Sequence, residues 1–233
     1  MDSNRKTAII VGVLFIIVVV SIIISGDFLG SINDPDYLTA VSANENQVLI
    51  GVLLMLTLVA SVVAIPIMMF PILKKRSESL ALGYVGARIF EGFADAVIYG
   101  IGPLLLLTLS QEFVNAGAPV ASYFQTSGAL LHAVNDWTSV LENFPYGLGA
   151  LIFNYLLYKS KLIPRWLSVW GLIGATLMLA TGVIRMFDPS LIYGALPILV
   201  NEMVLAIWLI VKGFNSSAIA SPSEKTDMIE EMV

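Results

Sequence analysis

Long apolar segments alternate with short polar stretches along the whole chain. A helix needs about 20 apolar residues to cross a hydrocarbon core about 30 Å thick. Segments of this kind predict membrane spans at about residues 7–25, 47–73, 79–109, 134–158, 165–187 and 191–214. We therefore expect an all-α protein, with residues 1–214 forming an integral membrane helical bundle of six transmembrane helices.

Two connecting regions are less regular than the spans. Residues 118–142 are only moderately apolar, so they either lie at the outer surface as a separate helix or extend the fourth span outward with a bend at Pro145. Residues 215–233 are rich in serine and acidic side chains, a composition that buries too little apolar surface to fold. This segment predicts a disordered cytoplasmic tail.

Basic residues are confined to alternate connections of the predicted bundle. With six spans, the termini, the second-to-third loop and the fourth-to-fifth loop all lie on one side of the membrane. Ten of the twelve lysines and arginines fall in these segments, and residues 26–46 and 110–143 contain none. The ten are Arg5, Lys6, Lys74, Lys75, Arg76, Lys159, Lys161, Arg165, Lys212 and Lys225. The positive-inside rule then predicts a multi-pass protein of the cell membrane with cytoplasmic N- and C-termini.

Composition agrees with a membrane protein and narrows the chemistry. The 233 residues are 58% hydrophobic and 12% charged, whereas soluble domains carry roughly 25% charged residues. The chain has no cysteine and a single histidine, which excludes disulfides, thiol catalysis and a multi-histidine metal site. No cofactor or nucleic acid is expected, and the lipid bilayer is the first partner that the sequence implies.

Four polar residues interrupt the third span at helical spacing. Arg88, Glu91, Asp95 and Tyr99 are three, four and four residues apart, so one face of the helix carries all of them. An isolated charge in the bilayer costs about 2.5 to over 10 kcal/mol. This face must therefore point toward protein or water, and its charges must be paired.

The sixth span places Glu202 near mid-depth, next to Asn201. Arg88 and Glu202 are expected to pair, because both must be buried at similar depth. Pro197 predicts a kink shortly before this acid. Asn154, on the fourth span, falls at a comparable depth. The predicted buried polar cluster comprises Arg88, Glu91, Asp95, Tyr99, Asn154, Asn201 and Glu202.

The cluster carries more acids than bases. Glu91, Asp95 and Glu202 face one buried arginine, an excess of two negative charges, or of one if Asp95 reaches Arg185. We expect at least one of these acids to be protonated near neutral pH, so that the site exchanges a proton or binds a cation.

Three functions remain open at this point. The leading hypothesis is that the cluster binds or translocates a small polar solute, a lipid headgroup, a proton or a cation. The alternatives are a structural or regulatory membrane subunit with a purely structural polar network, and an intramembrane enzyme. An enzyme is the least favoured, since the sequence offers no catalytic nucleophile or metal ligand set.

A second polar group lies on the outer side. His132 and Asp136 are four residues apart and would meet on a helix. Ser139 could complete a triad, but no glycine-flanked nucleophile elbow accompanies it. We interpret His132 and Asp136 as an outer-side hydrogen-bonding pair.

Three segments of the chain resemble a known family. They are "LALGYVGARIFEG", "LLYKSKLIPRWLSVWGLIGA" and "ILVNEMVLAIWLIVKGF". They look like recurring segments of prokaryotic multi-pass membrane proteins grouped as domain of unknown function 4386, and the likeness covers about residues 5 to 214. The resemblance implies a multi-helix integral membrane protein and brings no activity, substrate or catalytic residue. The family's fourth-helix segment is glycine-rich and places its histidine later than His132.

The six-span topology can be tested with reporter fusions. A reporter fused after Val114 should report from outside the cell membrane, and one fused after Phe214 from the cytoplasm, because the basic segments stay inside. A cytoplasmic signal at Val114 would contradict the six-span arrangement.

Overall fold

The structure, a computed structural model, describes residues 3–116, 121–188 and 193–219. Within these residues the chain is all-α and contains no strand. The helices are α1 (Ser3–Phe28), η1 (Gly30–Asn33), α2 (Tyr37–Ala43), α3 (Glu45–Leu73), α4 (Glu78–Ala96), η2 (Val97–Ile101), α5 (Gly102–Ala116), α6 (Ala121–Ser160), α7 (Arg165–Arg185), η4 (Tyr193–Ala195), α8 (Leu196–Val211) and α9 (Ser216–Ile219).

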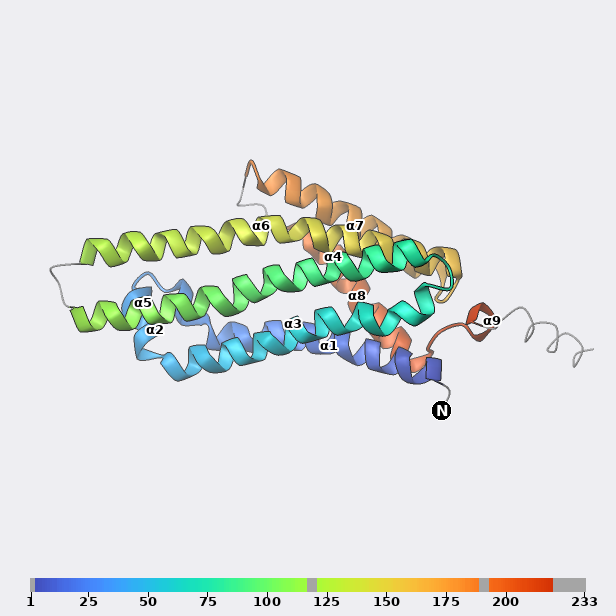
Figure 1. The fold of residues 1–233 in the computed structure, drawn as a ribbon, viewed down its shortest axis with the longest axis horizontal. Helices are drawn as coiled ribbons and strands as arrows, with labels where there is room; N and C mark the ends of the chain where they lie inside the picture. Colours follow the sequence, from blue (N-terminus) through green and yellow to red (C-terminus); the bar gives the residue numbers. More distant parts are fainter. Residues whose placement is uncertain (1–2, 117–120, 189–192, 220–233) are drawn as a thin grey trace, which may run out of the picture.

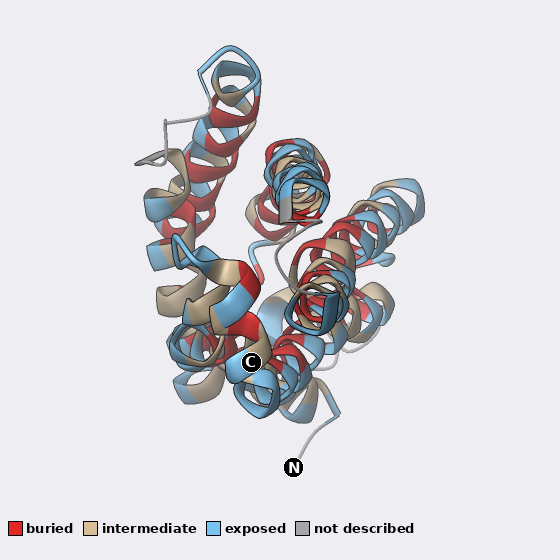
Figure 2. Ribbon diagram, turned by 90° about the vertical axis from the view of Figure 1, so that its left-hand side faces the viewer, coloured by how far each residue is buried: buried red, intermediate tan, exposed pale blue. Residues whose placement is uncertain are grey.

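The long helices form a closed ring in chain order. α1 packs on α3, α3 on α4, α4 on α6, α6 on α7, and α7 on α8, and α8 returns to pack on α1. The helices run roughly along the long axis of the molecule (Figure 1). Viewed along that axis, buried residues concentrate on the faces that the helices turn to one another, and exposed residues cover much of the outer faces (Figure 2). A ring of this kind can enclose a central space.

The outer surface of the ring is apolar. Large hydrophobic side chains such as Ile23, Leu53, Phe90 and Phe93 are more than half exposed, as lipid-facing residues are. Four helical stretches are long and apolar enough to cross a membrane: Ser3–Phe28, Glu45–Leu73, Glu78–Ala116 and Arg165–Arg185. These helices indicate a membrane location.

The other two predicted spans correspond to helices of a different character. α8 has 16 residues, fewer than the roughly 20 that a straight span requires. α6 has 40 residues, about 60 Å of helix, but polar residues are frequent along it. The presence of six membrane spans therefore remains a prediction.

The structure decides how residues 121–142 are arranged. They form one helix with the predicted fourth span, α6, which passes through Pro145 without ending. The third span is continuous from Glu78 to Ala116 but contains a π-helical turn, η2, that the sequence pattern did not indicate.

Two further expectations concern the C-terminal part. The kink predicted at Pro197 is wrong, because α8 begins at Leu196 and the proline occupies its first turn, where its missing N–H leaves no hydrogen bond unmade. Of the predicted tail, residues 215–219 are described and include α9, and residues 220–233 lie outside the described residues.

The two ends of the bundle differ in construction. At one end, α5 and the first half of α6 reach beyond the ring, and α2 packs against α5 (Figure 1). At the other end, a large core unites α1, α3, α4, α6, α7 and α8 around Tyr84, Phe153 and Leu205. This second end carries the basic loops and the N-terminus (Figure 1).

The close packing of α1 on α8 yields a stability prediction. A Cβ added at Gly12 would lie 2.7 Å from the Ala206 carbonyl oxygen and 2.7 Å from Cγ1 of Ile210. Gly12→Ala should therefore destabilise the bundle by about 1–3 kcal/mol, because the two backbones must move apart. At Gly86, nothing lies within 4 Å of such a Cβ, so Gly86→Ala is the matched control. Unfolding midpoints in detergent micelles compare the two, and equal midpoints would contradict the packing.

Candidate functional site

A cavity of about 230 Å³ lies inside the ring, and α1, α3, α4, α6, α7 and α8 all contribute to its walls. We call it the central chamber. Its polar lining consists of Arg88, Glu91, Asp95, Tyr99, Glu142, Tyr146 and Glu202. The remaining walls are apolar and include Phe15, Val62 and Met178. Four carboxylates and one guanidinium thus share a small space surrounded by hydrophobic side chains.

Arg88 is the electrostatic centre of the chamber. Its Nη1 donates to both carboxylate oxygens of Glu91, at 2.6 and 2.8 Å, across one turn of α4. Its Nη2 lies 3.5 Å from Oε1 of Glu202 on α8, so the expected pairing of these two residues is present. The guanidinium also lies over the ring of Tyr146, 5.4 Å from its centre. Arg88 therefore connects α4, α6 and α8 through charge and aromatic contacts.

Asp95 and Glu142 line the chamber without a partner of this kind. Asp95 is 5% exposed, and Glu142 faces the same space from α6. Their negative charges lie close enough to repel each other. Within the described part of the chain, neither carboxylate makes an ion pair or a hydrogen bond. These two residues thus lack a partner at ion-pairing distance, although Arg88 attracts both charges from farther away.

Glu142 and Tyr146 are the residues that the sequence interpretation missed. They are four residues apart and so share one face of α6. The same i, i+4 criterion that identified Arg88 and its neighbours would have found them. The sequence interpretation did not include them because the segment up to residue 142 is only moderately apolar. Its hydropathy therefore did not indicate where the segment lies relative to the membrane.

Two residues of the predicted cluster do not line the chamber. Asn154 donates to the carbonyl of Ala150 at 2.9 Å and fills the space where a side chain at Gly171 would collide with it. Asn201 donates to the carbonyl of Leu167 on α7 at 2.9 Å. Both amides contribute to helix packing around α7, and the structure brings the other five members together around the chamber.

The predicted outer-side pair is not joined. His132 packs edge-on against Tyr37, with ring centres 4.7 Å apart, while Asp136 is exposed. Both lie in the described residues, and no hydrogen bond or ion pair connects them. Ser139 accepts from Nη2 of Arg185 at 3.1 Å instead of contacting the histidine. This arrangement does not form a catalytic triad.

His132 lines a second cavity, the outer cavity, of about 280 Å³. Asn33 and Asn135 supply further polar groups to it. Ile22 and Tyr99 line both the outer cavity and the central chamber, so the two spaces adjoin at these side chains. Tyr99 lies in the π-helical turn η2, and such turns are frequent at functional sites.

The carboxylates surround the chamber and do not form a compact ligand set. Among the described residues, no group of three or more histidine, cysteine, aspartate or glutamate side chains could hold a metal ion.

The pairing of Arg88 can be measured with a double-mutant cycle. Arg88→Gln should destabilise the protein by about 3–5 kcal/mol, because it leaves buried carboxylates unpaired. In the Glu202→Gln background the same change should have a smaller effect, since the two side chains interact directly. Arg76→Gln, in an exposed loop, serves as the control. Additive effects of Arg88→Gln and Glu202→Gln on the unfolding free energy would contradict the pairing.

Comparison with known proteins places the chain in a family. It matches a protein of Archaeoglobus fulgidus, named only as an uncharacterized protein, with 28% identity over 103 residues. That alignment covers 43% of this chain and 63% of the relative, so the chain spans less than two thirds of the relative's length. No solved structure matches it. The family model described as "Domain of unknown function (DUF4386)" matches residues 10–213, which include every residue that lines the chamber, and the chain therefore belongs to this family.

Proposed function

We propose that the protein binds a small organic cation in its central chamber in exchange for protons, and that it moves this cation across the cell membrane. The observation that carries the proposal is the lining of the chamber, where Glu91, Asp95, Glu142 and Glu202 face a single arginine. The ligand class is a small amine in its ammonium form.

The charge excess is the first argument. Arg88 offsets one of four negative charges. Arg185 does not line the chamber, but it interacts with Glu142 from a distance and offsets a second charge at most. Two or three uncompensated carboxylates cannot persist as anions among hydrophobic walls. Protons or a bound cation must therefore balance these carboxylates. A site that accepts either protons or a cation can exchange one for the other.

The shape of the chamber is the second argument. Its volume of about 230 Å³ suits a compact ligand and is smaller than a typical drug-sized site. Tyr99 and Tyr146 add aromatic rings to the carboxylate lining. Aromatic faces and carboxylates together attract ammonium groups, through cation–π contacts and charge-assisted hydrogen bonds.

An access route supports translocation as well as binding. The outer cavity adjoins the chamber at Tyr99 and opens among α1, η1, α5 and α6. If both termini are cytoplasmic, as the basic loops favour, this end of the bundle faces outward. A ligand would enter past His132 and Asn135 and reach the carboxylates once Tyr99 moves aside.

A structural role for the network is the second candidate. The bonding of Arg88 to Glu91 and Glu202 favours it, because these contacts fix α4 against α8. A structural role does not explain the presence of Asp95 and Glu142. These two residues have no such contacts and add charge that opposes folding. The binding role accounts for both pairs of acids.

Proton release on ligand binding tests the proposal. Methylammonium, added to the purified protein in weakly buffered detergent, should release protons from the chamber. Glu142→Gln should reduce this release, because it removes one exchanging carboxyl. Asp136→Asn is the matched control, since it changes an exposed carboxylate on the same helix. No proton release from the wild-type protein, or equal release from both variants, would contradict the proposal.

A further inference from the structure

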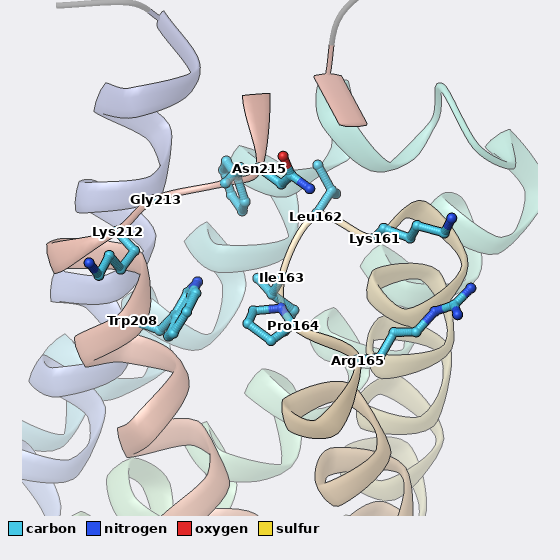
Figure 3. A pocket seen from close by; sticks show the side chains of 10 residues that line it. Lys161, Leu162, Ile163, Pro164, Arg165, Trp208, Lys212, Gly213 and Asn215 are labelled. Atoms are coloured by element: carbon cyan, nitrogen blue, oxygen red, sulfur yellow. The ribbon is translucent and has the colours of Figure 1, made fainter. Parts of the chain in front are cut away.

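A third cavity lies at the opposite end of the bundle from α5, among the basic loops. It has a volume of about 500 Å³, and we call it the basic cavity. Its walls are the α6–α7 loop with the start of α7, and the end of α8 with the segment that follows (Figure 3). Lys161 and Arg165 lie on one side of it, and Trp208 and Lys212 on the other (Figure 3).

The charge of this region is of one sign. Lys161, Arg165 and Lys212 line the basic cavity, and its described lining contains no acidic residue. An adjoining cavity of about 400 Å³ shares Lys161 and is likewise lined by basic and neutral residues in the described chain. It adds Lys75, Arg76 and Lys159. Six basic side chains thus border two adjoining hollows, which makes this end strongly attractive to anions.

Local structure holds the basic cavity in shape. Lys161 has a φ of 56°, a left-handed conformation that turns the chain sharply between α6 and α7. The backbone N–H of Asn215 donates to the carbonyl of Leu162 at 2.9 Å and so fixes the segment after α8 to this loop. The cavity is therefore built by two chain segments that are bonded to each other.

The end of α8 would repel an anion if its carbonyls were uncovered, because a helix C-terminus carries partial negative charge. Arg5 covers the carbonyls at this helix end. It donates to the carbonyls of Leu209 and Ile210 at 2.9 and 2.5 Å, so these groups are already satisfied. The basic side chains beside the hollow are Lys161, Arg165 and Lys212. Figure 3 shows their charged ends directed away from its centre, and the guanidinium of Arg165 lies over the ring of Tyr158, 5.2 Å from the ring centre, so these long side chains must turn inward to meet a ligand.

The surroundings of the basic cavity indicate a lipid. Trp208 forms part of its wall, and tryptophan is typical of membrane interfaces. Ile207 and Val211, on the same stretch of α8, are 58% and 63% exposed and offer apolar surface to acyl chains. A ligand that combines a phosphate with acyl chains would use both features.

We propose that the basic cavity binds the phosphate of an anionic lipid headgroup, with the acyl chains lying along α8. Free phosphate has the same charged group but none of the apolar part. The site is separate from the central chamber and does not depend on its proposed function.

Lipid retention provides the test. The full chain is reconstituted in nanodiscs of phosphatidylcholine and phosphatidylglycerol and returned to detergent, and the phospholipid retained per protein is measured. The wild type should retain phosphatidylglycerol preferentially. The double variant Lys161→Gln/Lys212→Gln should retain at least about fivefold less phosphatidylglycerol than the wild type. Each lysine near an anionic lipid surface contributes about 1 kcal/mol to the binding free energy. Both side chains are exposed, so the substitutions leave the core unchanged.

The matched control is Lys6→Gln/Lys74→Gln, which removes the same charge from exposed positions at the same end but outside both cavities. It should retain the lipid nearly as well as the wild type. Equal losses in the two double variants would overturn the site, because they would show attraction to the whole basic surface. A different result would assign the cavity to free phosphate: inorganic phosphate displaces phosphatidylglycerol, and the protein then retains both lipids equally. That result would overturn the proposal of a lipid ligand.

Discussion

The ion pairing of Arg88 is the interaction on which the interior depends. One guanidinium bonds to Glu91 on its own helix and reaches Glu202 on α8, so it connects two helices on opposite sides of the chamber. A charge so deeply buried requires partners, and the partners in turn require the arginine. The closed ring of helices follows the same constraint, because the lining of the chamber must be kept from the hydrocarbon of the membrane.

The pairing leaves part of the acidic lining unexplained. Asp95 and Glu142 share the chamber and lack such contacts, and a purely structural network would have no need of them. A neutral amide at either position would satisfy the packing at a lower desolvation cost. Their presence is the reason for proposing a function in which charge changes, with protons leaving when a cation enters.

Sequence pattern alone predicted much of this arrangement. Hydropathy located the long helices, and the i, i+3 and i, i+4 spacings of Arg88, Glu91 and Asp95 identified one wall of the chamber. Glu142 was missed because a polar helix such as α6 gives a weak hydropathy signal. Asn154 and Asn201 were included because depth along a helix can be read from sequence, whereas rotation about its axis depends on packing. The π-helical turn at Tyr99 has no signature in the local sequence, and Gly102, directly after it, packs against Asn135 on α6.

Infrared spectroscopy of the buried carboxyl groups tests the central claim most directly. Protonated carboxyls absorb separately from carboxylates, so titration from about pH 5 to about pH 9 reports on the chamber itself. The account predicts a carboxyl band that changes over this range, that is altered in Glu202→Gln, and that loses intensity when methylammonium is added. A spectrum in which no buried carboxyl titrates in this range and no cation has an effect would contradict it.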